Sequence, residues 1–239
     1  MNNNLENVIE YLKDTDARVV GGGRKTQSCI NKPNFYIVCP CCKSQKPLCG
    51  NGLGAFVNVN VGHRPFDSFK NFNTYFDTVK AFQGSLTPAY KLYNGEKGAR
   101  SPHYICHEHN KKNLYILSTA WGIVNSEFEL PEYNVTFSAD DNTALQSDGE
   151  YEDTQWRNGM SRAFNELATL SDKSLPVVMI GGDSYIKRFL FLSRKILNPV
   201  VIFTRKASII EECKRKKIPY VKANTDTRTN WYYKYMEII

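Results

Sequence analysis

Short runs of apolar residues alternate along this chain with longer segments in which apolar residues recur at helical spacing. A strand that a sheet buries on both faces is a continuous apolar run, whereas a helix packed on a sheet buries one stripe. The apolar runs predict strands at Phe35–Cys39, at Leu114–Leu117, from Pro176, from Pro199 and at Pro219–Val221, and alternation predicts another at Ala55–Val61. Helical spacing predicts helices at Leu5–Lys13, Phe66–Phe82, Thr154–Leu170, from near Asp183 and at Ala207–Lys217.

The order of these elements predicts the fold. Strands separated by helices favour an α/β protein, a three-layer α/β/α sandwich with a mainly parallel central sheet. A chain of 239 residues is long enough for one such core, so residues 31–239 are expected to form a single domain. Residues 1–30 are expected to form a helix and an irregular arm, because three glycines follow the helix. A polar loop is expected between Phe82 and Leu114.

Charge and composition narrow the choice of partner and compartment. The formal net charge of +7 suits a polyanion without requiring one. No apolar run approaches the roughly 20 residues that span a bilayer, and the amino terminus does not resemble a signal peptide. We therefore expect a cytoplasmic protein with no membrane partner. Seven cysteines, an odd number, indicate thiols, metal ligands or catalytic groups rather than a disulfide framework.

The stretch LYILSTAWGIVNSEFELPEY, from Leu114, ends a buried strand in small, polar and aromatic residues. Open α/β sheets bind ligands at the carboxyl ends of their strands, so Ser118 and Trp121 are expected in the active site. The stretch resembles a motif of the peroxide-stress YaaA-like proteins, in which "ILS" and "GL" precede a proline or acidic residue and a tyrosine, here Tyr133. The segment TPAYKLYNGEKG, from Thr87, resembles a second element of that family. The same motif resembles one in related bacterial and phage proteins of unassigned function and in the C-terminal domains of archaeal tRNA-guanine transglycosylases. All of these look like relatives of the uracil-DNA glycosylase fold, which implies a nucleobase substrate.

The cysteine-rich loop after the first strand, CPCCKSQKPLCGNGLG, allows three interpretations. Its thiolates could hold a structural zinc ion together with Cys106, His107 or His109 of a distant segment, although the spacing departs from paired CxxC knuckles. The cysteines could instead simply pack in the core and the loop. The resemblance implies a third role, in which the loop lines a base pocket. The metal-ligand candidates are Cys39, Cys41, Cys49 and Cys106.

The same loop resembles the uracil-DNA glycosylases in layout, with Phe56 in the place of the aromatic residue that stacks on the base. It departs from them because no Asp, Asn or Glu stands at the start of the loop, where those enzymes carry the residue that activates water. The nearest amides are Gln45 and Asn51. The residues expected to line a base pocket are Cys42, Gln45, Asn51, Phe56, Ser118, Trp121 and Tyr133.

Carboxylates provide the candidate catalytic groups. Cleavage of an N-glycosidic bond develops positive charge on the sugar, which a nearby carboxylate stabilises while it orients water. Glu129 and Glu132 lie in the continuation of the motif that begins at Leu114. Asp183 follows two glycines at a predicted helix start, where backbone amides bind anions. Each of them also has a plainer interpretation, as a solvated loop carboxylate or as an ordinary helix N-cap. The residues expected to contact nucleic acid are Lys43, Lys46, Lys91, Tyr93, Ser184, Lys187, Arg228 and Asn230.

The combined expectation is a monofunctional DNA glycosylase that flips a modified base, such as a bulky phage-type base, into a pocket and leaves an abasic site. No cofactor is required for that chemistry. A role in phage DNA metabolism or antiphage defence would follow from such a substrate. The alternatives are a non-enzymatic, zinc-containing protein that binds DNA or RNA, and a base-exchange enzyme or accessory protein of nucleic-acid modification.

Overall fold

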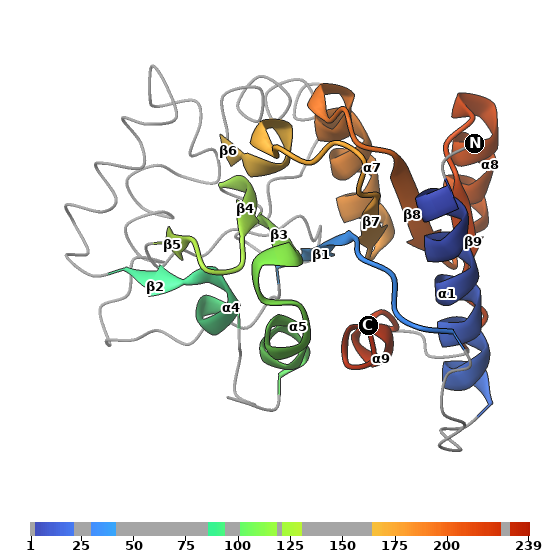
Figure 1. Ribbon diagram of the computed structural model, residues 1–239, viewed down its shortest axis with the longest axis horizontal. Helices are drawn as coiled ribbons and strands as arrows, with labels where there is room; N and C mark the ends of the chain where they lie inside the picture. Colours follow the sequence, from blue (N-terminus) through green and yellow to red (C-terminus); the bar gives the residue numbers. More distant parts are fainter. Residues whose placement is uncertain are drawn as a thin grey trace, which may run out of the picture. The chain divides into compact units, whose positions relative to one another are not determined.

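A computed structural model describes residues 3–21, 30–41, 86–93, 101–118, 121–130, 164–225 and 230–239. Its main feature is a seven-stranded sheet of order β6-β4-β3-β1-β7-β8-β9 with helices against it (Figure 1). The four strand pairs whose register is known within this sheet are all parallel. The prediction of an α/β fold with a mainly parallel central sheet is confirmed. The strands are β1 (Tyr36–Pro40), β3 (Leu114–Ser118), β4 (Gly122–Asn125), β6 (Phe164–Asn165), β7 (Val177–Ile180), β8 (Val200–Thr204) and β9 (Tyr220–Lys222).

The chain divides into two compact units, each built from separate stretches of sequence. The first unit comprises Met1–Pro40, Ile105–Tyr115 and Leu167–Ile239. The second comprises Cys41–Tyr104 and Ile116–Glu166. The expected division into an arm at residues 1–30 and a single domain at residues 31–239 stays a prediction.

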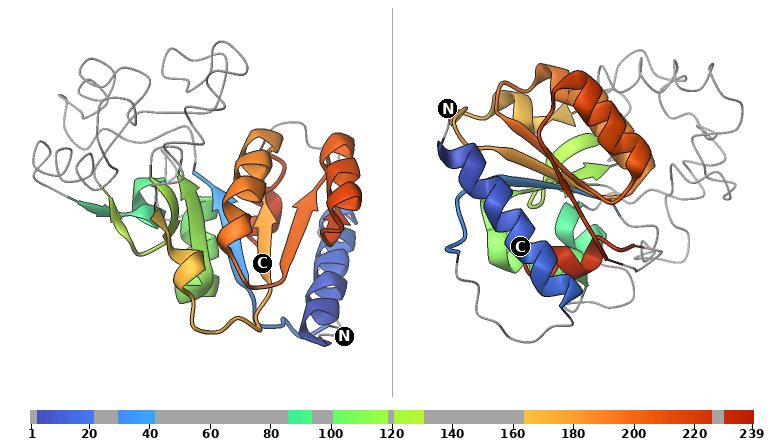
Figure 2. Two further views of the ribbon diagram at one scale, coloured as in Figure 1. Left: turned by 90° about the horizontal axis from the view of Figure 1, so that it is seen from above. Right: turned by 90° about the vertical axis from the view of Figure 1, so that its right-hand side faces the viewer.

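The first unit has helices on both faces of its parallel strands. The helices α7 (Asp183–Leu192) and α8 (Ala207–Lys216) cover one face, and α1 (Asn3–Val20) and α9 (Tyr233–Met236) lie on the other (Figure 2). Nearly every residue of β1, β7 and β8 is buried, as expected for strands covered on both sides. Their continuous apolar runs are therefore a direct consequence of the layered fold.

Helix α1 extends well beyond the predicted Leu5–Lys13 and is part of the first unit. It contacts β9 and α9, and its buried residues are Val8, Tyr11, Leu12, Thr15 and Asp16. We predicted that this helix ends at Lys13, because Thr15 and Asp16 are polar and interrupt the helical spacing of apolar residues. The Thr15 hydroxyl is satisfied within the helix, since it donates to the Tyr11 carbonyl at 2.9 Å.

Asp16 connects three separate segments of the first unit through its two carboxylate oxygens. Oδ1 accepts hydrogen bonds from the Tyr235 hydroxyl at 2.7 Å and from the Asn224 backbone N–H at 2.9 Å. Oδ2 accepts from the Asn224 side-chain amide at 2.6 Å. A buried carboxylate with three donors is well satisfied, so this cluster joins α1 to α9 and to the end of β9.

The carboxyl-terminal segment around α9 is packed into the first unit. The Trp231 and Tyr235 rings meet Phe203 of β8 at centroid distances of 6.0 and 4.8 Å. Both rings are buried. These aromatic residues therefore belong to the core of the unit rather than to a surface that stacks on bases.

The second unit contains a small antiparallel pair in addition to its share of the main sheet. The strands β2 (Thr87–Pro88) and β5 (Glu129–Leu130) pair beside the short helix α4 (Ala89–Leu92). Backbone N–H groups of Ala89 and Tyr90 donate to the carbonyls of Phe128 and Ser126, both at 2.9 Å. The two segments that carry the YaaA-like resemblance therefore lie in contact.

Two local predictions are wrong. The polar loop expected before Leu114 contains α5 (Pro102–Asn110) and a 3-10 turn, η2 (Lys111–Asn113). His103, Cys106 and His107 are buried on one side of α5. In the sequence, His and Cys side chains suggested metal ligands rather than the buried face of a helix. The end of the predicted helix Thr154–Leu170 is strand β6 followed by a 3-10 turn, η3 (Glu166–Thr169).

Between α7 and β8 the chain forms one further 3-10 turn, η4 (Ser193–Lys195). Within the described ranges, no helix is long and apolar enough to cross a membrane.

We predict that Tyr235→Phe lowers the free energy of unfolding by about 1–2 kcal/mol, because it removes one donor from the buried Asp16 carboxylate. The measurement is urea unfolding followed by circular dichroism. Tyr220→Phe is the matched control, because Tyr220 is half-buried and no hydrogen bond of its hydroxyl is found among the described residues. Equal effects of the two substitutions would contradict this role of Asp16.

The same hydroxyl predicts a loss of stability in alkali. Burial, followed by the nearby Asp16 carboxylate, raises the pKa of Tyr235 above its ordinary value of 10.0. The native state then holds a proton that the unfolded chain releases, so stability is fully present below pH 10 and falls as the pH rises further. The fall measured between pH 9 and pH 11 should be smaller in Tyr235→Phe than in the unaltered protein.

Candidate functional site

The strand order places a topological switch point between β1 and β7. From β1 the chain continues to β3 on one side, while β7 leads to β8 and β9 on the other. In open α/β sheets such a point leaves a crevice at the carboxyl ends of the two strands, and ligands bind there. The first unit contributes Pro40 from β1 and the sequence Gly181-Gly182 after β7 to this edge.

The two glycines have different roles at this edge. A Cβ atom at Gly181 would lie 2.5 Å from Cγ of Pro40, so only glycine fits there without movement of the backbone. A Cβ atom at Gly182 would meet nothing within 4 Å. The chain is therefore tightly packed at Gly181 and open at Gly182, directly before the start of α7.

The first turn of α7 faces this open space with its backbone amides. Gly182 is the N-cap residue, in an extended conformation, and Asp183 is the first residue of the helix. The interpretation of Asp183 as an ordinary N-cap is therefore wrong. No side chain caps the helix start, and the partial positive charge there favours an anion.

Asp183 and Lys206 form an ion pair across this edge, with Oδ2 and Nζ 3.4 Å apart. Lys206 follows β8 and is held by its backbone N–H, which donates to the Thr204 hydroxyl at 3.2 Å. Both charged side chains are considerably exposed, at 39% for Asp183 and 58% for Lys206, so they remain available to a ligand. Sequence analysis missed Lys206, although its position just after a buried strand is the same signal that indicated Asp183.

The site therefore combines a carboxylate, an ammonium group and free space beside an uncapped helix start. Ser184 is half-buried in the same helical turn, and Lys187 is exposed one turn further along. Such a set can hold a phosphate through the amides and the ammonium group. It can also present a carboxylate to a developing positive charge.

Ser118 and Trp121, predicted to line the base pocket, are buried in the second unit. The Trp121 backbone N–H donates to the Ser118 hydroxyl at 3.1 Å, which closes the turn after β3. Trp121 has no exposed surface. In the described structure these two residues therefore build the turn and the core of this unit.

Glu129 and Lys91 are exposed on the small β2–β5 region of the second unit. Glu129 lies opposite Pro88 in the strand pair, and Lys91 is in the adjacent helix α4. Tyr93 follows α4 but is fully buried, with its ring 6.3 Å from that of His103. The position of Tyr93 therefore does not support a direct contact with nucleic acid.

The described cysteines behave as buried thiols. Cys39 donates weakly to the Tyr115 carbonyl at 3.7 Å, and burial raises the pKa of Cys106 to about 12. Cys41 is also buried. In the part of the chain that the structure describes, no group of three or more His, Cys, Asp or Glu side chains could hold a metal ion.

Asn230 is exposed and has a positive φ of 49°, a conformation that asparagine tolerates better than most residues. The other predicted site residues lie outside the described ranges. They are Cys42, Lys43, Gln45, Lys46, Cys49, Asn51, Phe56, Glu132, Tyr133 and Arg228.

Glu166 is a carboxylate that sequence analysis did not select. It accepts a hydrogen bond from the Asn125 backbone N–H in the second unit. Burial raises the pKa of Glu166, and that hydrogen bond opposes the shift in part. Glu166 stands where two parallel strands, β4 and β6, end, and it fixes the chain there.

Comparison with known proteins adds no relative: no protein-family model, no curated protein and no solved structure matches this chain. The assignment of function therefore depends on the geometry and on the sequence resemblance.

We predict opposite outcomes for alanine at the two glycines. Gly181→Ala should lower the free energy of unfolding by about 1–3 kcal/mol, because the new methyl group overlaps the Pro40 ring. Gly182→Ala should change it by less than about 0.5 kcal/mol, because its Cβ enters open space. Thermal unfolding of both variants measures the difference. Equal destabilisation would show that the carboxyl ends of β1 and β7 do not approach so closely.

Proposed function

We propose that the protein is a DNA glycosylase, which hydrolyses the bond between a modified base and its sugar at the β1/β7 switch point. The observation that carries the proposal is the Asp183 carboxylate at the open start of α7, paired with Lys206. The resemblance of the LYILSTAWGIVN and TPAYKLYNG segments to relatives of the uracil-DNA glycosylase fold supports a nucleobase substrate.

In this proposal Asp183 acts on water and on the sugar. The carboxylate orients a water molecule and stabilises the positive charge that develops on the sugar as the bond from C1′ to the base nitrogen breaks. The bonding electrons leave with the base, and a proton completes the base nitrogen. The water oxygen bonds to C1′ and keeps one proton as the new hydroxyl group, while its second proton passes through Asp183 or solvent to the departing base nitrogen, and an abasic site remains.

The positive groups of the site would position the nucleic acid. The amides at the start of α7 and the Lys206 ammonium group suit a phosphate next to the flipped nucleotide. Gly182 leaves space for the substrate to approach the backbone, since no atom lies within 4 Å of its would-be Cβ. A modified base suits a sequence whose cysteine-rich segment departs from the pattern of enzymes that remove uracil.

We predict that Asp183→Asn reduces release of the modified base at least 100-fold and changes DNA affinity less than threefold, because it removes the charge and keeps the shape of the side chain. Mass spectrometry of free bases, after incubation with DNA from unmodified and hypermodified phages, provides the readout. Glu237→Gln, at an exposed carboxylate on the last turn of the chain, is the control.

Two outcomes would redirect the proposal. Base release that survives Asp183→Asn but is lost in Glu129→Gln would move the catalytic role to the second unit. Binding of DNA without release of any base would favour the non-enzymatic nucleic-acid-binding alternative.

A further inference from the structure

A basic surface lies at the edge of the sheet opposite the candidate site. In a parallel strand–helix–strand unit the helix begins at the carboxyl edge and ends at the amino edge. The helices α7 and α8 both connect parallel strands, so both end at the amino edge of the first unit. Exposed cations occupy these ends, and we name them the basic edge: Arg194, Lys195, Lys214, Arg215, Lys216 and Lys217.

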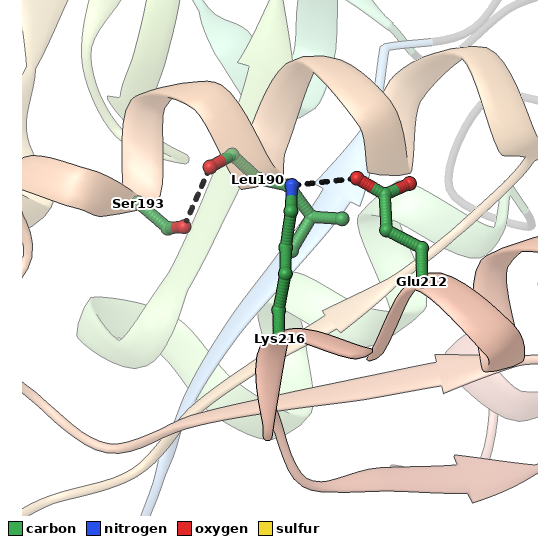
Figure 3. A network of polar contacts seen from close by, with 4 residues as sticks. All are labelled: Leu190, Ser193, Glu212 and Lys216. Carbon is green, nitrogen blue, oxygen red and sulfur yellow. Dashed lines mark hydrogen bonds and ion pairs between the residues drawn. The ribbon is translucent and has the colours of Figure 1, made fainter. Parts of the chain in front are cut away.

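The two helix ends that form the basic edge are neighbours. Helices α7 and α8 are in contact, and Figure 3 shows Leu190 and Ser193 of one helix end beside Glu212 and Lys216 of the other. Packed helices lie about 8–10 Å apart, so cations from both ends can face one extended ligand. The Ser193 hydroxyl donates to the Leu190 carbonyl at 3.1 Å and helps to end α7 at this point.

The charge of the basic edge is only partly neutralised. Lys214 pairs with Glu211 at 2.7 Å and Lys216 with Glu212 at 2.6 Å. Among the described residues, Arg215 and Lys217 have no ion-pair partner. Cations at a helix carboxyl end stabilise the helix dipole, but the effect is confined to the last turn and does not account for a surface shared by two helices.

We propose that the basic edge binds the phosphodiester backbone of nucleic acid, as a contact separate from the candidate active site. Exposed, flexible cations distributed over two neighbouring helix ends suit a repeating line of phosphates rather than one small anion. Strands of five residues span about 17 Å, which separates the two edges of the sheet. The basic edge therefore binds nucleic acid away from Asp183, at a position where no base is removed.

An anionic membrane is the competing polyanion, and the surface suits it poorly. Leu197, 77% exposed, is the large apolar side chain that the described structure exposes beside the basic edge. Stable attachment to a membrane surface requires an amphipathic helix with a broad apolar face or a second anchoring signal. A single leucine does not supply that.

The test measures binding of the full-length protein to unmodified duplexes of about 20 base pairs, in DNA and RNA arms, by fluorescence anisotropy between about 50 and 200 mM salt. In Arg215→Gln/Lys217→Asn we expect affinity to fall about tenfold and the steepness of the log–log salt dependence to fall by about 2. Asparagine is chosen at position 217 because Lys217 has a φ of 55°. The two arms distinguish the deoxyribose backbone from the ribose backbone.

The matched control is Lys13→Gln/Lys234→Gln, which removes the same charge from exposed positions on α1 and α9, on the other face of the sheet. Its affinity should stay within twofold of the unaltered protein. A second variant, Arg194→Gln/Lys195→Gln, should weaken binding like the first, and it keeps the test valid if substitution at the end of α8 impairs folding.

Equal losses in the variant and the control would overturn the proposal, because they would show a general effect of net charge. So would an absence of duplex binding, or tighter binding to phosphatidylserine vesicles than to either duplex. The proposal does not depend on the glycosylase activity, because the duplexes are unmodified. Loss of base release in Asp183→Asn with duplex binding intact would separate the two functions.

Discussion

The parallel pairing of β1 with β7, buried on both faces, is the constraint on which the rest of the first unit depends. It brings together two strands that are about 140 residues apart in the sequence, in the register Tyr36 to Val177. The two chains stay close at the end of β1 and just after β7, where a side chain at position 181 would overlap the Pro40 ring. Because β1 and β7 are fixed there, α7 must start at the edge of the sheet with its amides directed away from the core.

The first and last helices of the chain are held by polar as well as apolar interactions. Asp16 of α1 accepts hydrogen bonds from Tyr235 and Asn224, so a helix near the beginning of the chain is bonded to one near its end. A buried carboxylate is costly unless donors surround it, and this requirement makes the arrangement specific. The buried Trp231 and Tyr235 rings against Phe203 complete that side of the unit.

Charge is distributed unequally between the two edges of the sheet. At the carboxyl edge an acidic and a basic side chain are paired beside the amides of α7. At the amino edge cations predominate, at the ends of α7 and α8. Both edges result from the same right-handed strand–helix–strand connections, which direct helix starts to one edge and helix ends to the other.

The sequence alone was sufficient to predict the α/β class, the mainly parallel sheet and the buried strands, because a short continuous apolar run bounded by polar residues is typical of a strand covered on both faces. It also identified Asp183 as a candidate, since a charged residue after a buried strand and two glycines must lie at a sheet edge. It was less informative where burial and chemistry look alike: His103, Cys106 and His107 of α5, and Tyr93, are buried.

Only the tertiary structure decided which distant residues meet. It paired Asp183 with Lys206, bonded Asp16 to Tyr235, and placed α7 in contact with α8. It also placed the β2–β5 segments together, which the sequence presented only as two separate motifs. Strand order and register arise from long-range packing, and local patterns of polarity carry no record of which strand lies next to which.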